Sequence, residues 1–193
     1  MHTELLNVFR QIANLDTQEE DLFCELFKPK FLKKGDYFLE SGDKNNCIGF
    51  IKKGLVRYFV YKNEEESTLE FTKEGEFIAE YQSFINKSAS IQSIQAIEDC
   101  MLLVISHEDL QHIYTDTKHG NLLGRMVVEH RFNTMINQLL SVYMHTPQQR
   151  YKYFIENYSS LAQRIPQYLI ASYVGIKPQS LSRIRNRIAK GIS

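Results

Sequence analysis

The sequence lacks most of the residues and segments that mark secreted, membrane-bound or metal-dependent proteins. It has no tryptophan, and its three cysteines, Cys24, Cys47 and Cys100, are scattered without a C-x-x-C spacing. An odd, dispersed set of thiols is typical of reduced cysteines in the cytosol and argues against a zinc site or an iron–sulfur cluster. No apolar run approaches the roughly 18 residues of a membrane span, and no signal-peptide block opens the chain. We therefore expect a cytoplasmic protein with no metal site and no membrane contact.

Catalytic patterns are missing as well. The sequence contains no Walker loop and no Ser/His/Asp or Cys/His constellation, and its six histidines are dispersed. The acidic pairs Glu19–Glu20 and Glu64–Glu66 fit a helix start and a turn rather than a paired-carboxylate site. These absences predict that the protein is not an enzyme.

Charge is distributed unevenly along a chain whose formal net charge is zero. Residues 147–193 contain eight Lys or Arg residues and one acid, Glu156, so this segment carries +7 and residues 1–146 must carry −7. A basic segment of this size on a neutral protein is the electrostatic pattern of a nucleic-acid binder. The alternative is an ordinary amphipathic helical hairpin with a solvated basic face.

The basic segment also has the pattern of a helix-turn-helix. Residues 167–174 predict a first helix, and Gly175 suits the sharp turn after it because glycine accepts the left-handed conformation without steric cost. Pro178 is tolerated in the first turn of the next helix, which we expect to reach about Ala189. The apolar residues of this second helix are spaced three and four apart, at Leu181, Ile184 and Ile188.

The N-terminal part changes from helical to extended patterns. Two short helices are expected at residues 4–15 and 17–27, with Thr17 as the N-cap of the second. Short apolar and β-branched segments then alternate with turn signals, which predicts an antiparallel sandwich or barrel. These segments are residues 30–33, 37–40, 47–52, 55–61, 67–72, 91–96 and 100–105. A further short helix is expected from Ser106, whose hydroxyl can cap it, to about Tyr114, and another from Gln148 to about Tyr158, which Pro147 can open.

A long helix is expected from about Lys118 to Tyr143, and it has more apolar residues than one face can bury. A heptad-like seam steps by four and three through Leu122, Met126, Glu129, Asn133, Ile136, Leu140 and Tyr143. A second apolar line contains Leu123, Val127, Leu139 and Val142. A parallel partner helix in a homodimer would cover one face, with Asn133 fixing the register. The alternative is a helix buried wholly within the monomer.

A β-rich domain, a long helix and a C-terminal helix-turn-helix, in this order, resemble the Crp/Fnr family of bacterial transcription regulators. The resemblance covers nearly the whole chain and rests on SYVGIKPQSLSRIRNRI around the turn and on KKGDYFLESGD, FIKKGLVRYFV and GEFIAEYQSFINKSAS in the β-rich part. It implies an α+β fold with a double-stranded β-helix (jelly-roll) sensor of the cyclic-nucleotide-binding type at 1–117. A connecting and dimerisation helix would follow at 118–146, and a helix-turn-helix domain at 147–193. The implied partners are double-stranded DNA with a palindromic operator, a second copy of the chain, and RNA polymerase.

The segment GEFIAEYQSFINKSAS stands in the place of the family's phosphate-binding cassette. Glu80 and Ser88 match residues that bind the ribose hydroxyl and the cyclic phosphate, and Lys87 stands in place of an arginine. Ala79 replaces a glycine, so its Cβ obstructs a close backbone approach, and lysine lacks the planar fork of arginine. The intervening loop, residues 81–86, carries two aromatic side chains. We therefore expect no cofactor, and an empty or repurposed pocket rather than one that holds a cyclic nucleotide.

Carried over residue by residue, the family's recognition helix assigns roles to the polar face of the second helix. Base-edge contacts are expected from Gln179, Ser182 and Arg183, since Gln pairs with adenine and Arg with guanine. Phosphate contacts are expected from Lys177, Ser180, Arg185, Arg187 and Lys190. The alternative function is a ligand- or partner-binding sensor module whose basic helical end is a protein docking surface.

Overall fold

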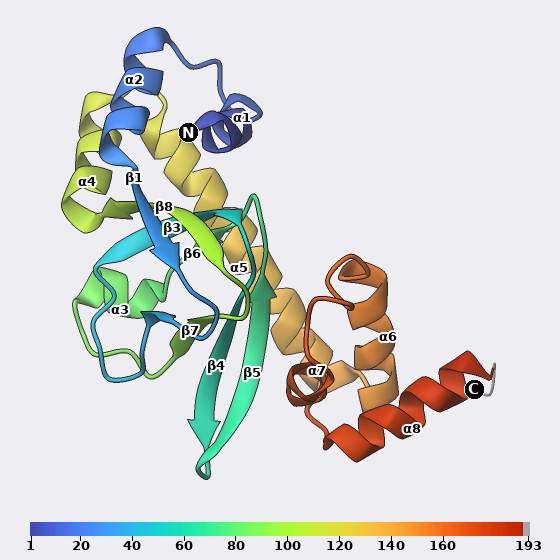
Figure 1. Cartoon of the computed structure of the whole chain (residues 1–193). Helices are drawn as coiled ribbons and strands as arrows, with labels where there is room; N and C mark the ends of the chain where they lie inside the picture. Colours follow the sequence, from blue (N-terminus) through green and yellow to red (C-terminus); the bar gives the residue numbers. More distant parts are fainter. Residues whose placement is uncertain (191–193) are drawn as a thin grey trace. The chain divides into compact units, whose positions relative to one another are not determined.

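The computed structural model of the chain describes residues 1–190 (Figure 1). The chain divides into two compact units. The first comprises Met1–Val60 and Glu70–Arg131, and the second comprises Tyr61–Leu69 and the chain from Phe132 onward. The predicted domain boundaries at residues 117 and 146 separate parts with different expected functions, and they stay a prediction. The last three residues of the predicted third domain, 191–193, lie outside the described part. Within residues 1–190, no helix combines the length and the hydropathy that a membrane span requires.

The first helix, α1 (Thr3–Arg10), is shorter than the sequence predicts. The expectation of a helix through residue 15 was wrong because the chain closes into a tight turn after Arg10. The N–H groups of Ile12 and Ala13 both donate to the carbonyl of Phe9, at 2.9 and 3.0 Å. A shared acceptor of this kind ends a helix.

The second helix, α2 (Thr17–Leu26), begins with a capping box. Its N-cap is Asp16, and not Thr17 as predicted. The Asp16 side chain accepts the N–H of Glu19 at 3.0 Å, and the Glu19 carboxylate accepts the N–H of Asp16 at 3.3 Å. Two donors that the helix leaves unpaired are satisfied in this way.

Two antiparallel four-stranded sheets confirm the predicted jelly-roll architecture. One sheet has the strand order β1-β8-β3-β6 and the other β2-β7-β4-β5. The strands are β1 (Lys28–Leu32), β2 (Tyr37–Leu39), β3 (Cys47–Lys53), β4 (Val56–Lys62), β5 (Glu65–Thr72), β6 (Phe77–Ile78), β7 (Ser93–Ala96) and β8 (Cys100–Ser106).

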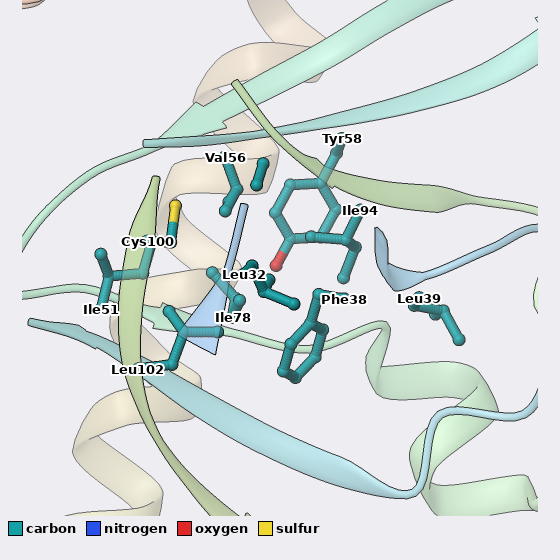
Figure 2. Packing of buried hydrophobic residues seen from close by; sticks show 11 residues of the cluster. Leu32, Phe38, Leu39, Ile51, Val56, Tyr58, Ile78, Ile94, Cys100 and Leu102 are labelled. Carbon is teal, nitrogen blue, oxygen red and sulfur yellow. The ribbon is translucent and has the colours of Figure 1, made fainter. Parts of the chain in front are cut away.

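The main core lies between the two sheets (Figure 2). Leu32, Ile51 and Leu102 come from the first sheet, and Phe38 and Ile94 come from the second. Successive residues of a strand point to opposite faces, so the neighbours of these residues form a second core. That core packs three strand residues, Phe50, Leu103 and Ile105, against α1, α2 and the helices that follow β8.

Residues 77–96 depart most from the prediction. The two-residue strand β6 was not expected, and residues 81–86, which we expected as a loop, form the helix α3 (Tyr81–Asn86). Strand β7 begins at Ser93 rather than at residue 91, and Ile91 is 75% exposed. Ser90 makes a local turn here, because its hydroxyl donates to the carbonyl of Gln92 and accepts the Gln92 N–H.

The remaining helices lie close to the predicted ranges. They are α4 (His107–Asp116), α5 (Gly120–Met144), α6 (Pro147–Asn157), α7 (Gln167–Val174) and α8 (Pro178–Ala189). Ser106 caps α4 by accepting the N–H of Asp109, as the sequence predicts. Thr146 caps α6 through a capping box with Gln149, and Pro147 occupies the first turn, where it needs no donor.

Candidate nucleic-acid interface

The turn between α7 and α8 depends on Gly175. This residue has a φ of +78°, the left-handed conformation predicted for it. Its N–H donates to the Ser172 carbonyl at 3.0 Å, and the Ile176 N–H donates to the Ala171 carbonyl at 3.0 Å. This pair of bonds is a Schellman motif, which closes a helix sharply. The end of α7 and the start of α8 are therefore fixed by local backbone bonding.

The apolar residues of α7 and α8 hold the two helices together. Leu169, Ile170 and Val174 of α7 are buried, as is Leu181 of α8. Phe154 of α6 is completely buried in the same unit. The predicted apolar line of α8 does not continue to its end, however, because Ile188 is 44% exposed.

Every side chain predicted to contact DNA is exposed on the described surface. The base-contact candidates Gln179, Ser182 and Arg183 are exposed, as are the phosphate-contact candidates Lys177, Ser180, Arg185, Arg187 and Lys190. Arg185 also donates to the side chain of Gln167 at 2.7 Å, which ties α8 to the start of α7. No acidic residue occurs between Gln167 and Lys190. The exposed surface of α8 therefore carries basic and neutral polar side chains and no acid, with Pro178 and Ile188 as its exposed apolar residues among those described.

A second contact to α7 was not predicted from the sequence. Strands β4 and β5 form a hairpin (Figure 1), and its end, Tyr61–Leu69, belongs to the same compact unit as α7. The Ser172 hydroxyl accepts the N–H of Thr68 at 2.9 Å and donates to the carbonyl of Glu66 at 3.1 Å. One α7 side chain thus binds the backbone of β5 twice.

The candidate ligand residues of the β-roll are placed around α3. Glu80 is buried and is the N-cap of α3: its carboxylate oxygens accept the N–H groups of Gln82 and Ser83, at 3.2 and 2.8 Å. Lys87 ends α3 in the left-handed conformation, with a φ of +55°, and both Lys87 and Ser88 are exposed. Each carboxylate oxygen of Glu80 accepts one N–H and keeps a further lone pair, so Glu80 can cap α3 and still accept a hydroxyl hydrogen bond. Of these three residues Glu80 is buried, whereas Lys87 and Ser88 face solvent.

An ion pair joins the β-roll to α5. The Arg131 guanidinium donates to both carboxylate oxygens of Glu70, at 2.6 and 2.9 Å, and Glu70 is 5% exposed. Arg131 also lies over the ring of Tyr58, whose hydroxyl accepts the N–H of Ala79 at 3.0 Å. Burial raises the pKa of the Tyr58 hydroxyl, so this phenol stays neutral. The ion pair attaches α5 to β5 at Arg131, which is the last residue of the first unit. Tyr58 lies between Arg131 and Ala79, the residue before Glu80.

The C-terminal half of α5 exposes apolar side chains. Val128, Phe132, Met135, Leu139 and Val142 are between 38% and 62% exposed, and they follow one another in steps of four and three. Of the predicted dimer-helix residues, Met126, Asn133, Ile136 and Leu140 are exposed and Leu122 is half-buried. In the predicted second line Leu123 is buried, whereas Leu139 and Val142 are exposed. The exposed side of α5 therefore includes an apolar seam that no polar residue interrupts.

Comparison with known proteins defines the class of the fold. Residues 29–117 match the cyclic nucleotide-binding domain family. FixK2 from Bradyrhizobium japonicum superposes with a TM-score of 0.74 at 12% identity, covering 86% of this chain and 85% of that chain. The c-di-GMP-responsive regulator CLP of Xanthomonas campestris gives 0.71 at 16%, covering 91% and 93%. A protein of Eubacterium rectale described as a Crp/Fnr-family regulator gives 0.68 at 19%, covering 92% and 85%.

These matches define the fold. Residues 29–117 are similar to the cyclic nucleotide-binding domain family. The chain as a whole has the fold of the Crp/Fnr-type regulators. The comparison with curated protein sequences gives no match.

Proposed function

We propose that the protein is a DNA-binding transcriptional regulator of the Crp/Fnr type that reads its operator through α8. The observation that carries the proposal is the surface of α8, whose predicted contact side chains are all exposed while Leu181 on the opposite side is buried. A helix held by its apolar side and free on a basic polar side can enter the major groove. The proposal includes a cytoplasmic location, no enzymatic activity and RNA polymerase as a further partner.

We also propose a homodimer that forms through α5. The exposed seam of Val128, Phe132, Met135, Leu139 and Val142 has the spacing of a coiled-coil interface. This seam is adjacent to the predicted one, and it lacks the polar Glu129 and Asn133. A two-fold dimer would place two copies of α8 in successive major grooves about 34 Å apart, so the operator should be palindromic.

The first test is selection of duplexes from a random-sequence DNA library by the full chain. We expect a palindromic operator whose binding weakens steeply as salt rises, because phosphate contacts release counterions. If the basic helical end is instead a protein docking surface, no sequence will be enriched and no such salt dependence will appear. That result would overturn the proposed function.

Substitution of Arg183 should separate base reading from general DNA affinity. Arg183→Ala should cost about 1–3 kcal/mol on the selected operator and relax the preference at one base pair, because Arg reads guanine with two hydrogen bonds. Fluorescence anisotropy with single-base operator variants measures both effects. Equal losses on all duplexes would show that Arg183 contacts phosphate instead.

Lys190→Ala is the matched comparison for a phosphate contact. It should weaken binding to all duplexes alike and reduce the salt slope by about one. The base preferences should stay those of the unsubstituted chain. A changed preference at any base pair would contradict the assignment.

The effector of the β-roll is proposed not to be cyclic AMP. The support is that Ala79 carries a Cβ where the family pattern has glycine, that Lys87 lacks the planar fork of arginine, and that Lys87 and Ser88 are both exposed. Isothermal titration of the full chain with cyclic AMP should give no saturable heat, and cyclic AMP should leave operator affinity unchanged. A saturable site that disappears in Glu80→Ala would refute this part of the proposal.

A further inference from the structure

Arg150 reaches the C-terminal ends of two different helices. It lies on α6, and its Nε donates to the carbonyl of Val174, the last residue of α7, at 2.8 Å. Its Nη1 donates to the carbonyls of His145 at 2.9 Å and Val142 at 3.4 Å, at the end of α5. A single guanidinium therefore joins α5, α6 and α7, and all of these residues belong to one compact unit.

The carbonyls that Arg150 binds have lost their usual helical donors. The N–H of Thr146, four residues after Val142, donates to the Gln149 side chain at 2.8 Å. The N–H of Gln149, four residues after His145, donates to the Thr146 hydroxyl at 3.3 Å. The capping box of α6 thus removes both donors from the end of α5. A helix C-terminus attracts cations, so the positive charge of the guanidinium is favourable here. The guanidinium also has enough N–H donors to bind all of these carbonyls at once.

The third carbonyl lies at the turn of the helix-turn-helix. The Schellman bonds at the end of α7 use the carbonyls of Ala171 and Ser172, which leaves the Val174 carbonyl to Arg150. The approach is close: a Cβ at Gly175 would lie 3.3 Å from Arg150 Nη2. Arg150 is therefore packed against the segment that sets the direction of α8.

We propose that Arg150 is a positioning residue that fixes the helix-turn-helix relative to the C-terminal end of α5, and through it the half-site spacing that a dimer recognises. The inference rests on the proposed function. In a dimer formed through α5, the direction of α7 and α8 from the end of α5 sets the distance between the two reading helices. That distance decides which spacing of half-sites fits both helices at once, about one helical turn of DNA.

The test uses the full chain with Arg150→Gln, Arg150→Lys and the control Lys152→Gln. Lys152 is on the same helix and its side chain is 73% exposed, so its loss removes the same charge without contact to a helix end. The probes are the operator that the unsubstituted chain selects from a random library, the same operator with its centre lengthened by one or two base pairs, and an unrelated duplex of equal length. Circular dichroism and thermal unfolding identify the temperature range in which each variant is folded.

Arg150→Gln should lose operator affinity about ten-fold or more, because charged hydrogen bonds at both helix ends are removed. The lengthened operators should lose less, so the preference for the native spacing shrinks. Affinity for the unrelated duplex and the salt slope should not change. Arg150→Lys should lose less operator affinity and less of the spacing preference than Arg150→Gln. Its ammonium group keeps the charge but cannot reach all of the acceptors as the planar guanidinium does. Lys152→Gln should keep the spacing preference.

Two results would overturn the inference. Uniform weakening on all duplexes with a salt slope reduced by about one would make Arg150 a phosphate contact. Folded Arg150→Gln and Arg150→Lys proteins with an unchanged spacing preference would make its role one of stability alone. If the unsubstituted chain selects no operator, the proposed function fails and this inference fails with it.

Discussion

Gly175 has a backbone conformation that other L-residues adopt only with strain. Gly175→Ala should lower the free energy of unfolding by about 1–2 kcal/mol, because a Cβ is costly in the left-handed region. The new methyl would also meet Arg150 Nη2 at 3.3 Å. Urea denaturation measures the stability, and anisotropy at a temperature where the variant is folded measures operator affinity.

Gly75 is the control for backbone strain alone, because it has a left-handed conformation but no atom close to the position of a Cβ. Its φ is +84°, and a Cβ there would meet nothing within 4 Å. Gly75→Ala should therefore cost a similar amount of stability and leave operator affinity unchanged, whereas Gly175→Ala should reduce both. Equal affinities in the two variants would contradict a role of the 175 turn in DNA reading.

The carboxylate of Glu19 is the clearest source of pH-dependent stability. It is 4% exposed and accepts the backbone N–H of His119 and bonds the His119 ring Nδ1, each at 2.8 Å. Burial acts to raise the pKa of Glu19, but the hydrogen bonds from His119 and from the Asp16 N–H outweigh it, so the pKa lies below the usual carboxyl range. These bonds join α2 to the start of α5.

A depressed carboxyl pKa stabilises the folded state above the unfolded pKa, and this stability is lost as pH falls through the folded pKa. Glu19→Gln should cost about 1–3 kcal/mol at pH 7, and its difference from the unsubstituted chain should shrink below a pH of about 4.3. Urea unfolding at a series of pH values measures it. The exposed Glu25→Gln on the same helix is the control, and a difference independent of pH would contradict the prediction.

Residue roles were predictable from the sequence where they depend on neighbours along the chain. The left-handed turn at Gly175 and the Ser106 cap are of this kind. Glu80 was predicted as a ligand residue from its place in a family pattern, and its use as the cap of α3 could not be read because α3 itself was not expected. The contacts of Ser172 with β5 and of Arg131 with Glu70 join residues 104 and 61 positions apart, and no local pattern indicates them.

At the scale of elements, length decides what a sequence can predict. The bounds of α7 and α8 agree with the prediction because glycine and proline mark the turn between them. The helix α3 has six residues and the strand β6 has two, too few for a hydrophobic period to be recognised. The exposed seam of α5 lies beside the predicted one, whose Met126, Ile136 and Leu140 are exposed as well, so residues of both apolar lines are left uncovered.

The seam on α5 gives a prediction about self-association. Leu139 is 52% exposed and lies within the seam, between Met135 and Val142. Leu139→Glu should abolish the dimer, because two carboxylates would meet in an apolar interface, and should leave the fold intact. Sedimentation equilibrium measures the association. Asn137→Glu, an exposed position on the opposite side of the helix, is the control, and a dimeric Leu139→Glu protein would place the interface elsewhere.

At the scale of the whole molecule, the compact units do not follow the order of the chain. The second unit contains the hairpin segment Tyr61–Leu69 together with everything from Phe132 onward. The sequence suggested consecutive domains because charge and pattern change at residue 147. The hydrogen bonds of Ser172 are a contact that a consecutive division does not include, because they join residues from the middle of the β-rich region to α7.

Hydrogen exchange can measure how firmly the hairpin is held. Ser172→Ala should speed exchange of the Thr68 amide on the order of 10-fold, because a net hydrogen bond is worth about 1 kcal/mol. Amides in the middle of α7 should exchange as before. Ser159→Ala, at an exposed serine, should have no effect on Thr68, and unchanged Thr68 exchange in Ser172→Ala would show that the hairpin is held by other contacts.

The hairpin that Ser172 binds also constrains how such a protein can be recombined. A helical domain made of residues 147–193 alone, joined to a foreign β-roll, would lack the β5 backbone that the Ser172 hydroxyl binds here. Conversely, a β-rich region joined to another helical domain would retain the β5 backbone groups that bind Ser172 here. The hairpin end and the helix-turn-helix therefore form one structural unit, and an exchange between relatives that keeps these hydrogen bonds must transfer residues 61–69 together with the helix-turn-helix.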